Sequence, residues 1–409
     1  MKKTYITRVK YLNQVKPFID KQIIKVFTGQ RRVGKSYLML QIIDLIKQTN
    51  KKATIVYIDK ENYAFDQIKN YHDLTQYIVA NTKKSSKNYI FIDEAQEIEG
   101  FEKAIRNFVA TKGYDIYLTG SNSELLSSDL AGKLSGRYIE IRVHPLSYQE
   151  FLSFHQLEKG LNSLEKYMRY GGLPYLVNLE LNDDQVFGYL KNVYDAVILK
   201  DVITRFSIRN INFLARLIEY LANNLGSLVS AKKISDFLKS QNIILSPNTV
   251  LNYLSFISSS FFINKAQRID IAGKKIFEVS EKYYFEDLGL RHVITNFKQI
   301  DINKILENLV YSKLIDEGYK VYVGQLDKNE VDFVGEIEGK RIYVQVAYII
   351  SSDKVTKREF GNLLRIKDNY PKYVVTMDTM ASGNVSGITH LHILDFLTKD
   401  LMKHGGKQP

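Results

Sequence analysis

Residues 29–36 read Gly-Gln-Arg-Arg-Val-Gly-Lys-Ser, which matches the phosphate-binding pattern G-x-x-x-x-G-K-[ST] in full. An apolar run at residues 23–27 comes directly before this loop, and a helical pattern at residues 37–43 follows it. In this strand–loop–helix context, successive backbone N–H groups and the positive end of the helix dipole point at the same anion. The octapeptide therefore predicts an α/β nucleotide-binding fold.

The residue types of the loop suggest individual roles. Gly29 and Gly34 allow the tight turn, the Lys35 ammonium is expected to neutralise the β- and γ-phosphates, and the Ser36 hydroxyl is expected to ligate Mg²⁺. The residues expected to line an ATP site are Gly29, Gln30, Arg31, Arg32, Val33, Gly34, Lys35, Ser36 and Tyr37. The two arginines either contact phosphate or face solvent.

Composition excludes several classes of protein. The 409 residues are 45% hydrophobic and 25% charged, which is ordinary for a globular protein and sufficient for two to four domains. No apolar run approaches the roughly 20 residues that cross a bilayer, and no signal-peptide pattern follows the basic start. Cysteine is absent, so disulfides and thiolate metal sites are excluded. These features favour a cytoplasmic protein without a membrane partner.

The formal net charge of +12 favours a polyanionic partner such as DNA. The excess Lys and Arg residues are spread along the chain, however, so a lysine-rich solvated surface explains the charge equally well.

The first 150 residues alternate short apolar strands with helical patterns, which predicts a parallel sheet covered on both faces. The expected strands span residues 23–28, 53–58, 89–92, 115–119 and 138–141. Ligands of such sheets bind at the carboxyl ends of the strands, which is where the phosphate loop lies.

The rest of the chain changes character twice. Residues 151–225 are expected to be mostly helical, with a turn at residues 171–174. A winged-helix pattern follows, with helices at 231–239 and 249–258 and a hairpin of residues 262–263 and 276–279. A final α/β region is then expected, with helices at 301–318 and 354–368 and strands at 319–323, 330–336, 341–349 and 372–377, followed by an α/β element at 387–396.

Residues 90–94 read Ile-Phe-Ile-Asp-Glu, an apolar strand that ends in two acids. Asp93 is expected to hold Mg²⁺, and Glu94 to orient and deprotonate the attacking water. Alone, this pattern also fits a solvated strand end. Downstream of a phosphate loop in the same sheet it predicts ATP hydrolysis.

Two further polar residues are candidates for catalytic roles. Asn122 follows the next strand and is the candidate to touch the γ-phosphate or the catalytic water, with Ser121 and Thr119 as rivals and a simple turn as the alternative. Arg137 precedes the fifth strand. It is either an arginine finger that reaches a neighbouring subunit of a homo-oligomer or a surface arginine in a local ion pair.

These motifs belong to an ordered set. After the phosphate loop come Phe-Ile-Asp-Glu-Ala-Gln, Leu-Thr-Gly-Ser-Asn-Ser, Leu-Ser-Gly-Arg-Tyr, Pro-Leu-Ser-Tyr-Gln-Glu-Phe, Tyr-Gly-Gly-Leu-Pro, Lys-Tyr-Tyr-Phe-Glu-Asp-Leu-Gly-Leu-Arg and Asn-Glu-Val-Asp-Phe-Val. Over nearly its whole length the chain resembles the prokaryotic AAA-type ATPases, relatives of the archaeal ATPase group, that carry a C-terminal domain of unknown function. The resemblance implies an AAA+-like P-loop NTPase domain at residues 1–155, a helical lid at 156–225, a winged helix at 226–300 and an α/β restriction-endonuclease-like domain at 301–409.

The implied restriction-endonuclease-like fold raises the question of nuclease activity. Metal-dependent nucleases of that fold use a helix Glu, a strand Asp and an (Asp/Glu/Gln)-x-Lys pair to hold Mg²⁺ and activate water. The matching residues are Glu307, Asp332 and Gln345, but Ala347 occupies the lysine position. The cations later in the chain that are candidates to replace this lysine in space are Lys354, Lys357 and Arg358. Without the lysine, the sequence favours a structural or nucleic-acid-docking role over cleavage.

The second helix of the winged-helix pattern, at residues 249–258, contains no Lys or Arg. Helices that read DNA normally offer cations and amides to phosphates and base edges. Here only Asn252, Tyr253 and the serines offer polar groups, so packing against a protein is as well supported as DNA binding.

The leading hypothesis is therefore a Mg²⁺-dependent ATPase that binds ATP and ADP and whose cycle acts on a partner, either a protein or DNA. One alternative is a nucleotide-switched DNA-binding or regulatory module with little turnover. The other is an ATP-gated metal-dependent nuclease.

Overall fold

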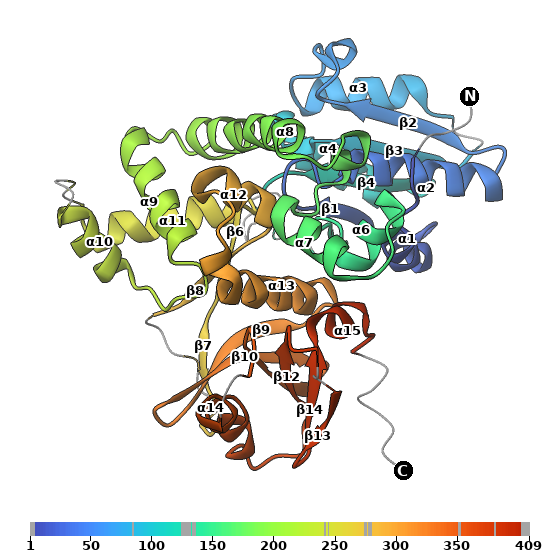
Figure 1. Cartoon of the computed structure of the whole chain (residues 1–409). Helices are drawn as coiled ribbons and strands as arrows, with labels where there is room; N and C mark the ends of the chain where they lie inside the picture. The colour runs from blue at the N-terminus through green and yellow to red at the C-terminus, as the bar shows by residue number, and fades with distance from the viewer. Residues whose placement is uncertain are drawn as a thin grey trace. The chain divides into compact units, whose positions relative to one another are not determined.

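Two compact units make up the chain in a computed structural model (Figure 1). The structure describes residues 5–83, 86–123, 132, 136–240, 243, 245–273, 276, 280–350, 353–379 and 382–401. The first unit comprises Met1–His144 and Ser259–Phe261, and the second comprises Pro145–Ser258 and Phe262–Pro409. The finer division into four domains stays a prediction. Among the described helices, none combines the length and apolarity that a membrane crossing requires.

The first unit is built on a five-stranded parallel sheet with the order β2-β3-β4-β1-β5. The strands are β1 (Ile24–Thr28), β2 (Thr54–Asp59), β3 (Asn88–Asp93), β4 (Tyr114–Gly120) and β5 (Tyr138–Arg142). The expected parallel α/β sheet is thus confirmed. The helices are α1 (Val9–Val15), α2 (Lys35–Thr49), α3 (Tyr71–Asn81) and α4 (Phe101–Ala110).

Alternation along each strand explains how the sheet is buried on both faces. On one face, residues such as Val26, Ile90 and Leu118 share a core with α3 and α4, to which Leu74 and Ile105 contribute. The residues between them point to the opposite face. This sandwich fixes the strand ends as rigid supports for a site.

The opposite face contains a charged pair that the sequence did not reveal. Lys25 on β1 and Asp115 on β4 form an ion pair, and both side chains are fully buried. Asp115 also accepts hydrogen bonds from the Tyr117 hydroxyl (3.0 Å) and from the backbone N–H of Asp20 (2.8 Å). Burial lowers the pKa of Lys25, and the attraction of Asp115 opposes that shift.

Strand order also decides which loops meet. β4 lies between β1, which carries the phosphate loop, and β3, which carries the two acids. Because all five strands are parallel, their carboxyl ends lie along one edge. The residues that follow β4 are therefore inserted between the phosphate loop and the acids.

The second unit begins with helices, as expected for residues 151–225 (green in Figure 1). These are α6 (Tyr148–His155), α7 (Leu161–Tyr170), α8 (Asp183–Ala196), the π-helix η6 (Val197–Thr204) and α9 (Ile211–Asn223). A hydrogen bond between two of the sequence motifs, Tyr-Gly-Gly-Leu-Pro and Lys-Tyr-Tyr-Phe-Glu-Asp-Leu-Gly-Leu-Arg, connects these helices to the buried helix α12 (Leu288–Thr295). The Asp287 carboxylate caps α12 at Leu290 N (3.0 Å) and accepts a hydrogen bond from Gly172 N (2.7 Å).

The region expected to be a winged helix contains α10 (Ala231–Ser240) and α11 (Pro247–Ser259), as the pattern predicted. The expected hairpin is wrong in its pairing. β6 (Ile263–Ala266) pairs with β8 (Lys282–Phe285), while Ile276 forms a bridge with Ile269, and residues 277–279 lie outside the described part. An apolar run of four residues gave no signal about which neighbour it would pair with. The winged-helix interpretation itself stays a prediction.

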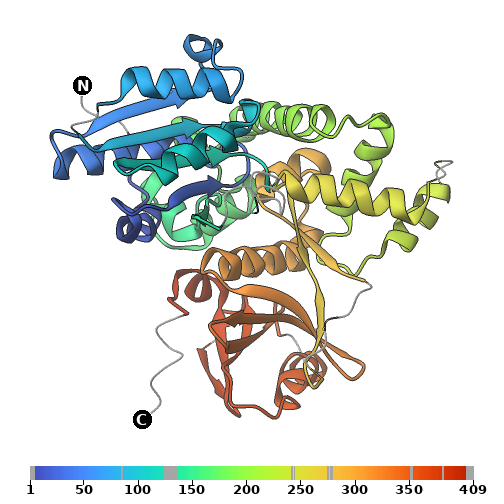
Figure 2. The same ribbon diagram turned by 180° about the vertical axis from the view of Figure 1, so that it is seen from behind.

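A mixed seven-stranded sheet completes the second unit, in the order β13-β14-β12-β11-β10-β9-β7 (Figure 2). Its strands are β7 (Arg268–Asp270), β9 (Lys320–Leu326), β10 (Asn329–Ile337), β11 (Lys340–Val346), β12 (Lys372–Thr376), β13 (Ser382–Val385) and β14 (Ile388–His392). The helices are α13 (Ile302–Asp316), α14 (Asp353–Leu364) and α15 (Ile393–Thr398). β7 precedes residue 300, so this sheet extends across the boundary predicted there.

We expect the buried Lys25–Asp115 pair to be a strong determinant of stability. Lys25→Met should lower the free energy of unfolding by about 3–5 kcal/mol, because it leaves the Asp115 charge buried without its partner. Urea denaturation followed by circular dichroism measures the change. The double variant Lys25→Met/Asp115→Asn should recover part of it. Lys191→Met in the exposed Lys191–Asp195 pair of α8 should cost less than about 1 kcal/mol. An equal loss of unfolding free energy in Lys25→Met and Lys191→Met would contradict the structural role assigned to the Lys25–Asp115 pair.

Candidate functional site

The phosphate loop runs from the end of β1 to the start of α2 and depends on two glycines with positive φ angles. Gly29 has φ 142° and Gly34 has φ 95°. A Cβ atom at Gly29 would lie 2.1 Å from the carbonyl oxygen of Val143, which no side chain tolerates. Glycine at this position therefore lets the loop lie directly against the chain that follows β5.

Lys35 is folded back onto the loop. Its ammonium donates hydrogen bonds to the carbonyl oxygens of Gly29 (2.9 Å) and Gln30 (3.1 Å) and lies 3.8 Å from a Glu94 carboxylate oxygen. The Gln30 side chain is fully buried, and its amide N and O have no hydrogen-bond partner among the described residues. A buried amide normally has partners. The Lys35 ammonium and the buried Gln30 amide lie in a loop whose shape fits an anionic ligand.

Asp93 ends β3 and is held by hydroxyl groups. It accepts hydrogen bonds from the Thr119 hydroxyl, from the Tyr57 hydroxyl (3.0 Å) and from Ser36. Burial raises the pKa of Asp93, and these hydrogen bonds partly offset the effect. Ser36 and Asp93, the two residues predicted to hold Mg²⁺, are thus brought together, and their oxygens are of the type that Mg²⁺ prefers.

Glu94 is buried and adopts a left-handed backbone conformation with φ 54°. Its carboxylate accepts hydrogen bonds from Ser121 N (3.2 Å) and from the Gln96 amide, and its own N–H donates to the Thr119 hydroxyl (2.8 Å). Burial alone would raise the pKa of Glu94. The Lys35 charge, the hydrogen bonds from Gln96 and Ser121 and the Arg31 charge together outweigh burial and lower that pKa, so the carboxylate is ionised at neutral pH.

The three candidates at the end of β4 occupy different positions. Thr119 contacts both acids through one hydroxyl, and Ser121 contacts Glu94 through its backbone. Asn122 is fully buried beside them. The sensor role of Asn122 stays a prediction, while Thr119 has the more direct connection to the acids.

The arginines differ in their surroundings, and the charge of Arg31 helps to lower the pKa of Glu94. Arg31 forms an ion pair with Glu61 (2.6 Å), and Arg32 is exposed with φ 71°. Tyr37 is exposed as well. Arg137 is exposed at the start of β5, and its carbonyl accepts a hydrogen bond from Ile24 N (2.9 Å) at the start of β1. Arg137 therefore lies at the edge of the sheet opposite the phosphate loop, so a finger role requires another subunit. Its motif partners Leu134 and Ser135 lie outside the described residues.

The second unit also brings acids together. The Lys282 ammonium on β8 forms ion pairs with Glu307 on α13 and with Glu330 on β10, each at 2.8 Å. Asp332 on β10 lies 3.8 Å from the same nitrogen. The Lys282 side chain is 4% exposed. Its burial would lower the pKa of Lys282, but the carboxylates outweigh burial and raise it. Burial first, and Glu307 second, raise the pKa of Asp332 to about 8.

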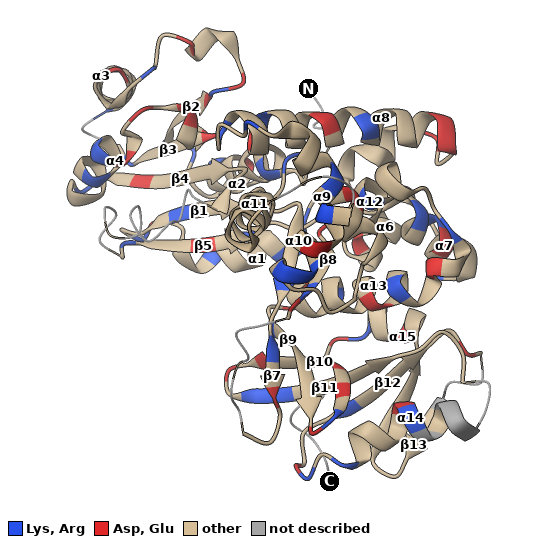
Figure 3. Cartoon of the chain, turned by 90° about the vertical axis from the view of Figure 1, so that its left-hand side faces the viewer, with Lys and Arg blue, Asp and Glu red and all other residues tan. Residues whose placement is uncertain are grey.

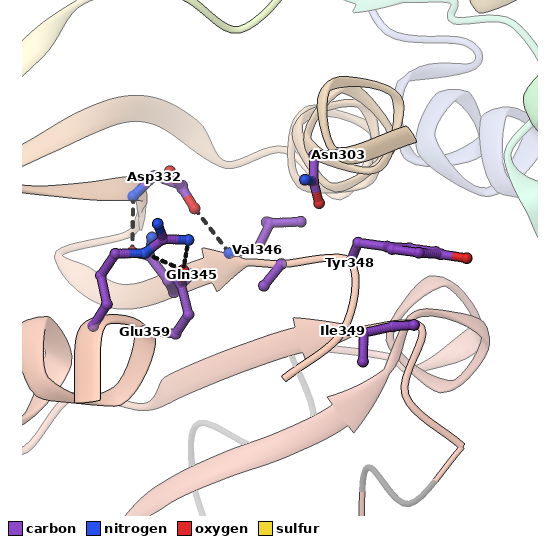
Figure 4. A pocket seen from close by; sticks show the side chains of 9 residues that line it. Asn303, Asp332, Gln345, Val346, Tyr348, Ile349 and Glu359 are labelled. Carbon is purple, nitrogen blue, oxygen red and sulfur yellow. Dashed lines mark hydrogen bonds and ion pairs between the residues drawn. The ribbon is translucent and has the colours of Figure 1, made fainter. Parts of the chain in front are cut away.

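Gln345 lies next to Asp332, as the sequence predicted, and accepts a hydrogen bond from its backbone N–H (3.3 Å). Figure 4 shows both residues with Glu359 at one side of a cavity of about 610 Å³ and Asn303, Tyr348 and Ile349 towards the other. The Arg358 side chain is exposed and forms an ion pair with Glu359. The side chains of Lys354 and Lys357 lie outside the described part.

Sequence reasoning missed Tyr57, Gln96 and Lys282. Gln96 is part of the motif Phe-Ile-Asp-Glu-Ala-Gln, two residues after Glu94, so its position in the sequence could have predicted a contact with Glu94. Nothing in the sequence indicates the contacts of Tyr57 and Lys282. Tyr57 lies 36 residues from Asp93, and pairing of β2 with β3 brings the two close. Lys282 lies 25, 48 and 50 residues from Glu307, Glu330 and Asp332, and only the tertiary packing of β8 brings it to them.

Comparisons with known proteins support the P-loop ATPase fold. Residues 21–152 match the family model of an AAA domain, and residues 161–301 match a domain of unknown function. An uncharacterised protein of Haemophilus influenzae is 35% identical over 97% of this chain and its own full length. Another from Methanocaldococcus jannaschii is 31% identical over 80% of this chain and 74% of its own.

A solved structure shares the fold. The Walker-type ATPase of Pyrococcus abyssi superimposes with a TM-score of 0.52 at 15% identity, over 71% of this chain and 96% of that chain.

We expect Lys35→Ala to weaken ATP binding about 10- to 100-fold, because one charge-assisted contact to phosphate contributes roughly 1.5–3 kcal/mol. Titration with a fluorescent ATP analogue measures the dissociation constant. Lys47→Ala is a matched control, because Lys47 is exposed on the same helix α2. Unchanged affinity in Lys35→Ala, or equal loss in both variants, would contradict the site.

Proposed function

For a chain that belongs to the family of AAA-type P-loop ATPases, we propose Mg²⁺-dependent hydrolysis of ATP at residues 29–36, Asp93 and Glu94, coupled to a change in the second unit. The observation that carries the proposal is the Thr119 hydroxyl, which donates a hydrogen bond to the Asp93 carboxylate and accepts one from the backbone N–H of Glu94. A site that only binds nucleotide needs no such alignment of Glu94.

The proposed roles follow from the contacts. The backbone N–H groups of the loop and Lys35 hold the phosphates, so Lys35 exchanges the carbonyl oxygens of Gly29 and Gln30 for phosphate oxygens. Ser36 and Asp93 hold the metal. When bound, Mg²⁺ neutralises charge that develops on the phosphates. Glu94 takes the proton of the attacking water, for which its lowered pKa keeps it ionised.

Withdrawal of Lys35 from Glu94 links binding to catalysis. The ammonium lies 3.8 Å from the carboxylate in this structure. When Lys35 moves to phosphate, Glu94 loses the charge that lowers its pKa most and becomes a stronger base. Ser121 N and Gln96 still hold the carboxylate in place. The base is thus activated only when nucleotide is present.

Coupling is supported by a route of contacts inside the first unit. Val143 lies against Gly29, and the Arg8 guanidinium donates to the carbonyl oxygens of Val33 (3.1 Å) and His144 (2.9 Å). Next to Val143, the guanidinium of Arg142 lies 4.8 Å from the ring centroid of Phe261. The phosphate loop, the end of β5 and Phe261 therefore form one packed series.

Phe261 has a special position in the chain. Ser259–Phe261 belongs to the first unit, whereas the residues before and after it belong to the second. α11 ends at Ser259 and β6 begins at Ile263. A shift of the phosphate loop that reaches Phe261 acts on both elements through the chain itself.

The partner that best fits α11 is a protein. No charged residue is present on this helix (Figure 3), and Leu251 is 50% exposed. Exposed Asn252 and Ser255 offer hydrogen bonds but no cation for phosphate. This composition favours packing against a protein over DNA binding at α11.

Glu94→Gln should retain ATP binding and lower hydrolysis by about 100-fold or more, because general-base catalysis contributes roughly 10²–10⁴-fold. The amide keeps the shape of the side chain but cannot accept the proton. Phosphate release and ATP binding are measured on the same preparation. Glu97→Gln, three residues along the same segment, is the control. Equal turnover in wild type and Glu94→Gln would favour a nucleotide switch without catalysis.

Phe261→Ala should uncouple the nucleotide site from α11 and β6. Hydrogen–deuterium exchange with and without ATP measures this. In wild type, we expect ATP to change exchange at residues 29–36 and also in α11 and β6. In Phe261→Ala, only the first change should remain. Phe261→Leu keeps apolar volume without the ring and should give an intermediate result. An unaltered ATP effect on α11 in Phe261→Ala would contradict the route.

A further inference from the structure

We propose that Lys282 is the resident cation of the acidic cluster formed by Glu307, Glu330 and Asp332, and that it occupies the place a divalent metal would need. The fold implied for the C-terminal region would hold Mg²⁺ at Glu307, Asp332 and Gln345. The residues present do not fit that ion while Lys282 is in place. This inference concerns the second unit and is independent of the ATPase proposal.

The geometry of the cluster is that of an ammonium site. The Lys282 nitrogen lies 2.8 Å from one carboxylate oxygen of Glu307 and 2.8 Å from one of Glu330, which are hydrogen-bond distances. Asp332 is 3.8 Å away. An ammonium has three donors, and three carboxylates from two elements surround it. Mg²⁺ would require oxygen ligands at about 2.0–2.1 Å and cannot share this position.

The backbone around the cluster fixes both the lysine and the acids. Lys282 pairs with Ala266 in the β6–β8 ladder, so its side chain leaves from a hydrogen-bonded strand. The Tyr284 hydroxyl, two residues along β8 and on the same face, donates to Glu307 at 2.5 Å. Asp332 lies where β10 shifts register against β9, and such a bulge re-aims a side chain.

The Asp332 carboxylate is also engaged away from the lysine. Its second oxygen accepts a hydrogen bond from Val346 N at 2.8 Å. Among the described residues, no group of three or more His, Cys, Asp or Glu side chains is arranged to hold a metal ion. Removing Lys282 would leave three acidic side chains without this cation. Uncompensated buried charge is costly, so a divalent ion becomes the alternative partner of the cluster.

The absence of lysine at position 347 therefore has a different meaning from the one the sequence suggested. The cation comes from β8, and it contacts the acids themselves. Since the acids are engaged by Lys282, they do not present a metal-activated water for attack on phosphorus. The second unit is then a packed module held by an ion cluster.

Mn²⁺ binding to the full-length, metal-free protein tests the proposal, with electron paramagnetic resonance measuring free Mn²⁺ in the absence of nucleotide. Because the first unit also has metal-binding groups, each comparison is a difference between variants. Wild type and Asp332→Asn should bind Mn²⁺ equally. Lys282→Met should gain a site at least tenfold tighter than any wild-type binding, and Lys282→Met/Asp332→Asn should lose it. Mn²⁺ should raise the melting temperature of Lys282→Met more than that of wild type.

Lys313→Met is the matched control, because Lys313 is also buried in this unit but contacts Glu317 on its own helix. It should gain no site. Wild-type Mn²⁺ binding that is weakened by Asp332→Asn or by Glu359→Gln would overturn the proposal, since the cavity would then hold a metal beside Lys282. Unchanged Mn²⁺ binding in folded Lys282→Met would also overturn it. If Lys282→Met does not fold, the comparison of wild type with Asp332→Asn still decides.

Discussion

The close approach of Gly29 to Val143 is the constraint on which the candidate site of the first unit depends. With no Cβ at position 29, the start of the phosphate loop lies against the carbonyl that follows β5, and the loop cannot move without moving that chain. The same stretch carries His144, which Arg8 ties to the loop carbonyl of Val33. The proposed nucleotide binding and the proposed transmission to Phe261 thus depend on the same contacts. A larger residue at position 29 would disturb both.

Three buried lysines of this molecule have different kinds of partner, and the kind of partner indicates whether the lysine has a structural or a ligand-binding role. Lys25 and Asp115 neutralise each other within the sheet and have no exposed surface. Lys282 neutralises acids from two elements and holds them together. Lys35 differs because it donates hydrogen bonds to the backbone carbonyl oxygens of Gly29 and Gln30, and its ammonium lies 3.8 Å from a Glu94 carboxylate oxygen. Breaking either of the two buried ion pairs would leave an uncompensated buried charge, whereas under the proposed function Lys35 exchanges backbone carbonyl oxygens for phosphate oxygens.

The sequence predicted those parts of the molecule whose signals are local. Five apolar strands separated by helices gave the parallel sheet, and residues 29–36 with Asp93 and Glu94 gave the candidate site, because each motif is contiguous. The sequence did not predict which distant segments pair with each other. The partner of β6 and the position of Lys282 depend on strand register over tens of residues. The burial of Lys25 was equally hidden, since one lysine in an apolar run does not reveal that Asp115 lies opposite.

The two acids at the end of β3 show why the proposed hydrolysis depends on the arrangement of the acids and not only on their residue type. Asp93 and Glu94 are adjacent, so their side chains would leave an extended strand on opposite faces. The left-handed backbone of Glu94, with φ 54°, ends the strand and turns the second carboxylate towards Ser121. Such a conformation is costly for a residue other than glycine and persists only where surrounding contacts hold it. Here the Thr119 hydroxyl accepts a hydrogen bond from the Glu94 N–H and donates one to Asp93, so a side chain of β4 links the proposed metal ligand to the proposed base.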